Sequence, residues 1–466
     1  MSLLIKNAHI VTGGEVVSGD LLAENGIVRH IGADIPVGPA LPDSAGPARV
    51  IDAQGKYLLP GGVDVHTHFA LDTGTARSVD DFHSGSVAAA CGGVTTIVDH
   101  LGFGPKGCRL EHQIDVYHEL ARDAVVDYGF HGVIQHVDDA VIADMAALAA
   151  RGISSCKLYL TYGYKLGDPE VLRVLERARE LGMIVCVHCE NDAVIRFRTR
   201  RLLAEGKKAP RHHAESRPDY CEAEAVWRML MLARAAGDAP VYVVHLSSEL
   251  GLETIRLARS RGQKNIYAET CPQYLVLDAS RYDNDREGLK YIMSPPLRGQ
   301  ADMEALWRGL EKGDVDTIAT DHCAFSFDPQ KLAGLGDFTR CPNGAPGVEN
   351  RMAVLFSEGF MKGRLSLPEV VRLCCTRPAQ IFGLYPRKGD LLPGSDADFT
   401  LFDPEKKTVV TAAALHDNAG YTPYEGMELT GAPVLTVSRG MVIMENGEFT
   451  GSAGRGKYCA RSVAGN

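Results

Sequence analysis

The pattern of this chain is clearest in residues 153–188, ISSCKLYLTYGYKLGDPEVLRVLERARELGMIVCVH. An apolar run typical of a strand is followed by an amphipathic helical segment and then by a second apolar run. The helix is marked by Asp168 at its N-cap, Pro169 in its first turn and Gly182 at its end. A strand, a helix and a second strand in this order are typical of a βα unit in a parallel sheet.

The same alternation continues on both sides of this segment. Eight strand candidates can be counted: 63–68, 95–100, 128–136, 153–160, 183–188, 241–245, 265–270 and 316–321. Eight strands, each followed by a helical segment, predict an α/β protein with a TIM-like (βα)8 barrel over residues 56–380. A doubly wound open sheet is the alternative, but no glycine-rich fingerprint follows the first strand.

Both ends of the chain have a different pattern. Short β-rich runs between residues 3 and 35 are broken by turn signals such as Asn25-Gly26, and similar runs return after Lys388. We therefore expect residues 1–55 and 381–466 to build one small β-sandwich lobe together.

Composition excludes several classes of protein. With 466 residues, 45% of them hydrophobic and 23% charged, the chain is neither a single small module nor disordered. Its 49 basic and 59 acidic residues give a net charge of −10 with no basic block, which argues against nucleic acid as a partner. The sequence has neither a signal peptide nor a membrane-spanning run, so we expect no membrane association and a cytoplasmic protein. Its 12 cysteines are scattered through apolar segments, as reduced buried thiols would be.

Polar residues gather at the ends of the predicted strands, where barrel enzymes carry their catalytic groups. The first strand brings Asp64, His66 and His68 to one face, because alternate residues of a strand share a face. Three further strands end at His188, His245 and Asp321. Four strands thus deliver imidazole and carboxylate groups to one rim, and these are ligands that zinc uses. This pattern predicts a metal site.

Lys157 lies inside a run that should be buried. One interpretation is a snorkelling or ion-paired lysine. The other is a neutral amine that adds CO2 and becomes an anionic carbamate able to bridge two cations, since burial lowers the pKa of an amine. Cys186 and Cys189 form the one CxxC motif, but no second pair accompanies it, and we interpret both as packing residues. We likewise expect His100, His136 and His322 to be core or supporting residues.

Six stretches of the sequence resemble one known family: GGVDVHTH at 61–68, VHCEN at 187–191, VHLS at 244–247, SPPLR at 294–298, ATDHC at 319–323 and GDFTRCPNG at 336–344. Together with Lys157 in the fourth strand, they resemble the cyclic-amidohydrolase branch of the amidohydrolase superfamily. The last motif and SPPLR are similar to the D-hydantoinase and dihydropyrimidinase group in particular. The resemblance runs over nearly the whole chain.

This resemblance implies two divalent metal ions, most simply zinc. One ion would be held by His66, His68 and Asp321, the other by His188 and His245, and N6-carboxylated Lys157 and a hydroxide would bridge them. The carbamate carbon would come from CO2. The ligand set also accepts cobalt or manganese.

The resemblance also implies catalytic roles. Tyr162 would donate a hydrogen bond to the carbonyl oxygen that becomes negatively charged, and Asp321 would take the hydroxide's proton and pass it to the departing ring nitrogen. Ser294 and Asn343 would hold the ring amides.

The substrate implied is a 5-substituted hydantoin, opened to an N-carbamoyl amino acid. Relatives that hold a carboxylate-bearing ring have an Arg two residues beyond His-x-His, where this chain has Ala70. We expect Tyr159, Leu166 and the loop 69–72 to line a partly apolar pocket for an aryl or alkyl group. The resemblance also implies that the enzyme is D-selective. Dihydropyrimidinase and allantoinase activities stay open as alternatives.

A third alternative is a non-catalytic assembly protein on the same fold. Such proteins are expected to lack metal ligands, whereas this chain keeps all six candidates. The resemblance further implies a homotetramer, with the tail 454–458 reaching a neighbouring subunit.

Overall fold

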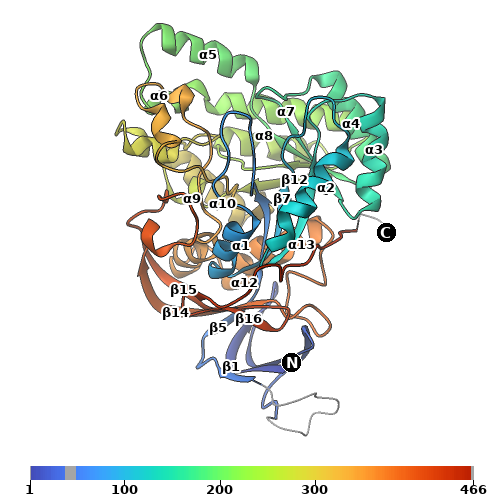
Figure 1. Cartoon of the computed structure of the whole chain (residues 1–466), viewed down its shortest axis with the longest axis vertical. Coiled ribbons are helices and arrows are strands. Elements are labelled where there is room, and N and C mark those ends of the chain that lie inside the picture. Colours follow the sequence, from blue (N-terminus) through green and yellow to red (C-terminus); the bar gives the residue numbers. More distant parts are fainter. Residues whose placement is uncertain (1, 37–48, 463–466) are drawn as a thin grey trace.

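The computed structural model describes residues 2–36 and 49–462 and contains a barrel and a separate sheet (Figure 1). Residues 1, 37–48 and 463–466 lie outside the described part of the chain. The two end segments predicted to form a lobe, 1–55 and 381–466, are therefore described only in part.

Eight parallel strands form the barrel, in the order β13-β12-β11-β10-β9-β8-β7-β6. They are β6 (Gly62–Thr67), β7 (Val94–His100), β8 (Asp127–Val133), β9 (Ser155–Tyr159), β10 (Ile184–His188), β11 (Val241–Val243), β12 (Ile266–Thr270) and β13 (Thr317–Ile318). The His68 N–H donates to the carbonyl of His322 at 2.9 Å, so the first strand also meets the segment that follows the last one. Each strand overlaps one predicted segment, and the prediction of a (βα)8 barrel is confirmed.

Helices cover the outside of the barrel (Figure 1). Those between the strands are α1 (Phe82–Cys91), α2 (Leu110–Leu120), α3 (Asp139–Ala150), α4 (Asp168–Glu180), α5 (Asp192–Ala204), α6 (Arg211–Ser216), α7 (Asp219–Ala235), α8 (Glu249–Ser260), α9 (Gln273–Val276) and α10 (Gln300–Glu311), and those after the last strand are α11 (Arg351–Val354), α12 (Leu367–Val371) and α13 (Arg377–Ile381). Within residues 2–36 and 49–462, none of the helices has the length and apolarity that crossing a lipid bilayer requires.

Helix α4 begins one residue earlier than its sequence signals suggest. Gly167 is the N-cap, and Asp168 is the first helical residue. The reason is that the Glu170 carboxylate accepts the Gly167 N–H at 2.7 Å, which satisfies a backbone donor at the helix start. The predicted end is correct, because the chain leaves the helix through Gly182 at φ 67°, a conformation that favours glycine.

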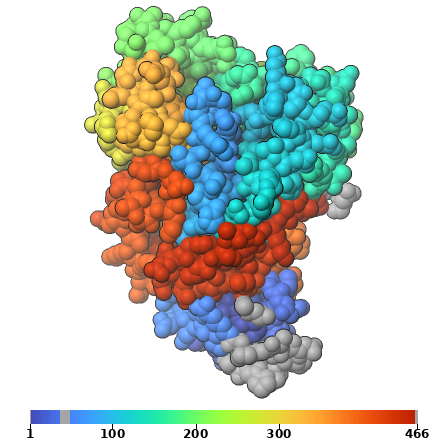
Figure 2. Space-filling view, viewed as in Figure 1, coloured from blue at the N-terminus to red at the C-terminus, as the bar shows by residue number. Residues whose placement is uncertain are grey.

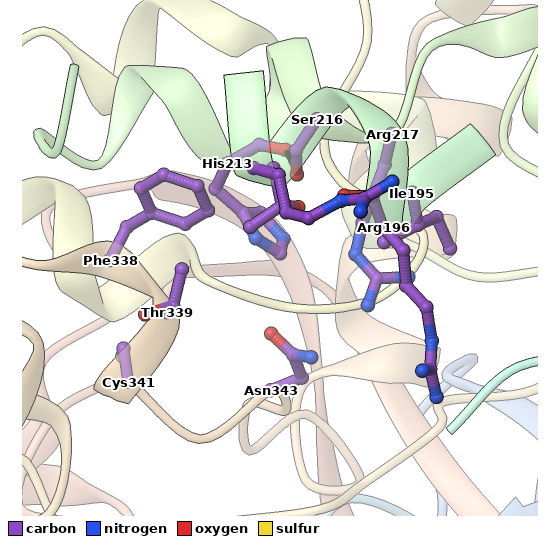
Figure 3. A pocket seen from close by; sticks show the side chains of 11 residues that line it. Ile195, Arg196, His213, Ser216, Arg217, Phe338, Thr339, Cys341 and Asn343 are labelled. Carbon is purple, nitrogen blue, oxygen red and sulfur yellow. Dashed lines mark hydrogen bonds between the residues drawn. The ribbon is translucent and has the colours of Figure 1, made fainter. Parts of the chain in front are cut away.

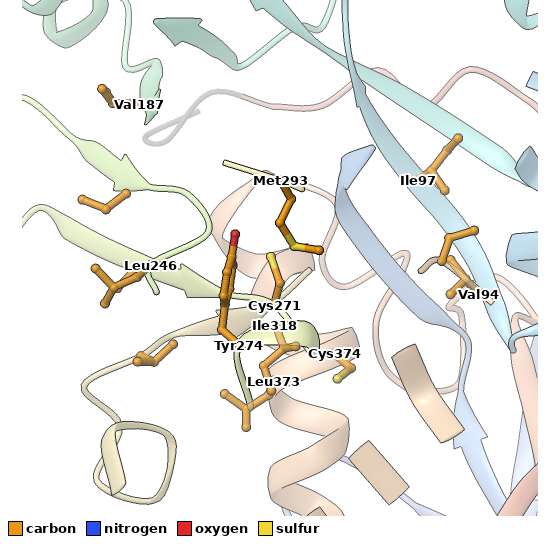
Figure 4. Packing of buried hydrophobic residues seen from close by; sticks show 14 of the residues in the cluster. Val94, Ile97, Val187, Leu246, Cys271, Tyr274, Met293, Ile318, Leu373 and Cys374 are labelled. Carbon is orange, nitrogen blue, oxygen red and sulfur yellow. The ribbon is translucent and has the colours of Figure 1, made fainter. Parts of the chain in front are cut away.

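Many apolar side chains of strands and helices pack into one large buried cluster. Figure 4 shows Val94 and Ile97 of β7 at the right, and Ile318 of β13, Leu373 and Cys374 near the centre. Burying one such aliphatic side chain stabilises the fold by about 1.5–3 kcal/mol. All twelve cysteines are free, and every one except Cys108 is buried, as predicted for reduced thiols.

The second sheet joins the two ends of the chain. Among the described residues it has nine strands: β1 (Ser2–Val11), β2 (Val16–Glu24), β3 (Ile27–Gly32), β4 (Arg49–Asp52), β5 (Tyr57–Pro60), β14 (Phe399–Val409), β15 (Glu428–Ser438), β16 (Met441–Glu445) and β17 (Glu448–Phe449). Strand β5 pairs with β14, with Phe399 opposite Pro60, and so connects the early strands to the late ones. Figure 2 shows the C-terminal part of the chain (red) beneath the barrel and the N-terminal part (blue) directly below it.

Ion pairs of Lys388 connect this lobe to the base of the barrel. Its ammonium lies 2.6 Å from carboxylate oxygens of Asp127 and Asp398 and 2.8 Å from Asp396, and the lysine side chain is only 1% exposed. Asp127 begins β8, whereas Asp396 and Asp398 precede β14. Burial acts to lower the pKa of Lys388, but the carboxylates outweigh it and raise the pKa above its ordinary value.

Replacing Lys388 with Met should strongly destabilise the protein. The change leaves buried carboxylates without their cation, and breaking a buried ion pair costs about 3–5 kcal/mol. Urea denaturation followed by circular dichroism measures this loss. As a control, Lys362→Met removes an exposed lysine paired with Glu358 and should change stability little; equal effects of the two variants would contradict the role of Lys388.

The C-terminal tail packs on its own barrel. Tyr128 in β8 donates its N–H to the Lys457 carbonyl at 3.0 Å and accepts the Cys459 N–H at 2.6 Å, and the Arg461 N–H donates to Gly152 at 2.9 Å. The tail thus lies at the base of the barrel and uses its backbone groups within the same chain. The expectation that residues 454–458 also reach a neighbouring subunit stays a prediction.

Candidate active site

The six predicted metal ligands lie together at the C-terminal end of the barrel. They line one cavity of about 740 Å³. They are His66 within β6, His68 just after it, Lys157 within β9, His188 at the end of β10, His245 after β11 and Asp321 after β13. Residues separated by up to 255 positions therefore meet at one rim, as the strand-end pattern predicts.

Their spacing makes one continuous cluster. Oδ1 of Asp321 lies 3.1 Å from Nε2 of His66 and 3.2 Å from Nε2 of His68. The rings of His188 and His245 are 4.6 Å apart, and His245 is 5.4 Å from His66, measured between ring centroids. Burial acts to raise the pKa of Asp321, but the adjacent imidazoles outweigh it and hold the pKa well below its ordinary value.

Three residues that line the cavity have a strained backbone conformation. His245, Asp321 and Tyr162 have φ values of 41°, 53° and 70°, a region that non-glycine residues rarely adopt. Each such residue costs about 1–3 kcal/mol, which the surrounding fold must supply. All three line the cavity, so the strain lies where the polar groups converge.

The buried carboxylate of Glu269 orients two of the histidines, His66 and His245. Its Oε1 lies 2.6 Å from Nδ1 of His66 and accepts the backbone N–H of His245 at 3.0 Å, while Tyr242 donates its hydroxyl to Oε2 at 2.8 Å. A carboxylate on one ring nitrogen leaves the other free to bind a metal. Glu269 was not predicted from the sequence, although a lone acid within the predicted strand 265–270 was a usable signal.

Glu190 orients His188 in the same way. Its Oε2 lies 2.7 Å from Nε2 of His188, and Arg217 donates to the same oxygen at 2.5 Å. Burial acts to raise the pKa of Glu190, but Arg217 and His188 outweigh it and lower the pKa to about 2. The carboxylate is therefore charged and fixes the His188 ring. Glu190 is in the VHCEN motif, but only the tertiary structure brings Arg217 to it.

The histidine nitrogens that Glu269 and Glu190 do not contact are suited to bind metal ions. Nδ1 of His68 and Nδ1 of His245 are buried with no hydrogen-bond partner, and Nε2 of His66 has only the Asp321 carboxylate near it. A buried polar atom without a partner costs about 1–3 kcal/mol, so these nitrogens need an ion or ligand to satisfy them. Imidazole and carboxylate donors suit zinc and similar divalent ions. The cluster therefore could hold a metal ion.

Lys157 differs from the other fully buried lysines. Lys388 contacts three carboxylates, and Lys331 donates to two backbone carbonyls at 2.7 and 2.8 Å. Among the described residues, no hydrogen bond or ion pair is formed by the Lys157 ammonium, although the lysine is only 1% exposed. Burial lowers the pKa of Lys157, which favours the neutral amine.

Tyr162, Ser294 and Asn343 also line the cavity. The Tyr162 ring lies 5.4 Å from His188 between ring centroids, and burial raises the pKa of its phenol, which keeps the hydroxyl a donor. Oγ of Ser294 is buried without a hydrogen-bond partner. Polar groups suited to a cyclic amide therefore face the histidine cluster.

The apolar wall of the cavity differs in part from expectation. Tyr159 lines it, but Leu166 does not: its side chain belongs to the buried core, and its N–H donates to the Tyr159 carbonyl at 3.1 Å. Of the loop 69–72, Leu71 alone lines the cavity. Three aromatic residues from separate loops, Phe103, Tyr164 and Phe325, also form part of the wall and were not predicted from the sequence.

The residues interpreted as packing or supporting groups lie outside the six-residue cluster. Cys186 and Cys189 are buried in the core, and His322 is held by Asp80 at 3.0 Å. His136 is half-buried, 3.8 Å from Asp138. His100 is closer, because its ring centroid lies 4.5 Å from that of His66, and the ligand atoms of His66, His68 and His100 are near enough to share an ion.

The fold and this site define the class of protein. Residues 57–443 match the model of the amidohydrolase family, and the chain belongs to that family. The prediction of an amidohydrolase enzyme is confirmed. Enzymes of this family are metal-dependent, in agreement with the donor atoms at the rim.

Among individual proteins, the chain is 52% identical over 462 residues to the D-phenylhydantoinase of Escherichia coli O1:K1 / APEC, covering 99% of this chain and 98% of that protein. The crystal structure of dihydropyrimidinase from Brevibacillus agri matches with a TM-score of 0.95 at 41% identity, covering all of both chains. The L-hydantoinase of Arthrobacter aurescens matches with a TM-score of 0.89 at 31% identity, covering 98% of this chain and 99% of that chain. The resemblance to the D-hydantoinase and dihydropyrimidinase group is confirmed.

Proposed function

We propose that the protein hydrolyses the ring amide of 5-substituted hydantoins to N-carbamoyl amino acids, with a preference for aryl substituents and D-products. The observation that carries this proposal is the convergence of six metal-compatible side chains beside an aromatic-walled cavity. The similarity to D-phenylhydantoinase supports the choice of substrate.

The metal site in this proposal holds two divalent ions, most simply zinc. His66, His68 and Asp321 would hold one ion, His188 and His245 would hold the other, and Lys157, carboxylated by CO2, would serve as a further ligand. When bound, the ions supply an activated hydroxide at neutral pH and polarise the substrate carbonyl.

Side chains of the cavity carry the proton and charge transfers. Asp321 accepts the proton of the nucleophile and returns it to the ring nitrogen as the amide bond breaks. Tyr162 donates its hydroxyl to the carbonyl oxygen as negative charge develops there. Ser294 and Asn343 hold the ring amides, and Tyr159 contacts the C5 substituent. Leu166 supports Tyr159 from the core, because its backbone binds the Tyr159 carbonyl.

Replacing Tyr162 with Phe should lower kcat by about 10²- to 10³-fold, the cost of losing one donor to a developing oxyanion. KM should change much less, because the ring that lines the cavity remains. Steady-state kinetics with 5-phenylhydantoin measure both constants. Tyr458→Phe is a suitable control, since that tyrosine donates its hydroxyl to the Arg151 carbonyl at 2.9 Å and lines neither cavity. Unchanged kcat in Tyr162→Phe would contradict its role.

The second candidate is hydrolysis of dihydropyrimidines, which the similarity to the Brevibacillus agri dihydropyrimidinase supports. A panel of 5-phenylhydantoin, 5-alkylhydantoins, dihydrouracil and allantoin separates the candidates. We expect the highest kcat/KM for the aryl hydantoin and a D-configured product on chiral chromatography. A preference for dihydrouracil or allantoin would overturn the proposal, and absence of ring opening with any of them would favour a non-catalytic protein.

We further propose that the protein is a cytoplasmic homotetramer. Light scattering on the purified protein tests the assembly, and a monomer at assay concentration would contradict it.

A further inference from the structure

A second cavity, of about 580 Å³, lies beside the catalytic one (Figure 3). One side is the face of helix α5 that carries Arg196 and Arg200, and the other is the loop with Phe338 and Asn343. The lining residues are Ile195, Arg196, Thr199, Arg200, His213, Ser216, Arg217, Phe338, Thr339, Cys341 and Asn343. None of the proposed metal ligands is among them.

The charged side chains that line this cavity are basic, whereas the protein as a whole is acidic. Three arginines line it and no carboxylate does, although the chain carries a net charge of −10. Arg196 pairs with Asp192 at 2.8 Å and Arg217 pairs with Glu190, but within the described residues Arg200 forms no ion pair. Arginine's planar group binds carboxylates through paired hydrogen bonds, so the cavity favours a carboxylate ligand.

The same cavity also has an apolar side. Ile195 and Phe338 contribute aliphatic and aromatic surface to it. Figure 3 shows the Phe338 ring across the cavity from the Arg196 side chain. A ligand that combines a carboxylate with an apolar group therefore fits both sides at once.

The two cavities share a wall. Thr339, Cys341 and Asn343 line both of them. The guanidinium of Arg217 lies 5.6 Å from the ring centroid of Tyr162, which faces the catalytic cavity. A molecule formed at Tyr162 is thus next to the arginines of the second cavity.

We propose that this second cavity is a product subsite that binds the carboxylate of the N-carbamoyl amino acid. The inference rests on the proposed function. Hydrolysis breaks the ring C–N bond, adds hydroxide oxygen to the carbonyl carbon and places a proton on the nitrogen. A neutral ring thereby becomes an anion that carries one carboxylate, a ureido group and the apolar C5 substituent. The arginines distinguish this product from the substrate by its charge.

The test compares product inhibition with substrate binding. Arg196→Gln and Arg200→Gln, singly and together, are assayed with 5-phenylhydantoin as substrate and N-carbamoyl-D-phenylglycine as inhibitor. Each change should raise the inhibition constant of the product about fivefold, the effect of one partly screened charged hydrogen bond. KM for the neutral hydantoin should stay within about twofold, because it carries no carboxylate.

Arg201→Gln is the matched control. Arg201 follows Arg200 on the same helix, is 71% exposed, pairs with Glu205 and does not line the cavity. It removes the same charge and should leave the product's inhibition constant unchanged. The methyl ester of the product should bind the wild-type protein and the Arg200→Gln variant equally weakly.

Three results would overturn the inference. The first is an unchanged inhibition constant in the double variant, and the second is an equal rise in Arg201→Gln, which would indicate only a long-range field. The third is a parallel rise of KM, which would make the cavity a substrate site. Product binding is also measured by titration calorimetry without turnover. Failure of the proposed function, seen as no ring opening by the wild-type protein, is therefore distinguishable from failure of the subsite.

Discussion

Replacing Asp321 with Asn should lower kcat by about 10⁴-fold, the upper end of what one proton-transferring group contributes. The amide has the shape of the carboxylate but cannot accept the proton of the nucleophile. Asn also tolerates the left-handed backbone that Asp321 adopts at φ 53°, so the fold should remain. Steady-state hydantoin kinetics measure the loss, and circular dichroism checks the fold.

The matched control is Asp238→Asn, which makes the same substitution at φ 61° outside both cavities. It should keep wild-type kcat. Metal analysis of the Asp321→Asn protein distinguishes loss of the proton carrier from loss of an ion. Turnover above about a tenth of the wild-type rate, far beyond what loss of a general base allows, would refute the role of Asp321.

Replacing Lys157 with Met should lower activity by about three orders of magnitude or more, because the metal site would lose a ligand and with it the activated water. The stability of the metal-free protein should not fall, because Met fills a similar volume and removes a buried amine that forms no hydrogen bond or ion pair among the described residues. In ¹³C-bicarbonate, NMR should show a carbamate signal in the wild-type protein that the variant lacks.

Lys331→Met separates these effects. That lysine is also buried, but it donates to the carbonyls of Ile292 and Pro342, so its loss should destabilise the protein and leave the carbamate signal in place. A wild-type protein with no carbamate signal after supply of zinc and bicarbonate would contradict the assignment of Lys157.

The barrel and the rim residues were predictable because their signals are local. A strand is recognised from its own apolar run, and the residue at its end, such as His188 or Asp321, is read directly from the sequence. Parallel strands of a barrel all end at one rim, so four strand ends suffice to predict one site. The resemblance of the 336–344 motif to the D-hydantoinase and dihydropyrimidinase group then narrowed the expected reaction to hydrolysis of a cyclic amide.

The supporting residues were not predictable in the same way. Glu190 is two residues from His188, but its partner Arg217 is 27 residues away and follows helix α6. Phe103 stacks on Tyr164 from another loop, with ring centroids 3.6 Å apart. Leu166 was expected to line the pocket because its side chain is apolar, yet its N–H donates to the Tyr159 carbonyl and its side chain lies in the core.

The sequence by itself determined the strand and helix order, the ligand types at the strand ends and the family. These depend on periodicity and residue chemistry within short segments, where each residue's neighbours in the chain are also its neighbours in space. Tertiary structure alone decided which nitrogens are left free, which acids orient them, and that three arginines form a second cavity beside the first. Those features depend on contacts between distant segments, and only the closed barrel with its long loops brings such segments together.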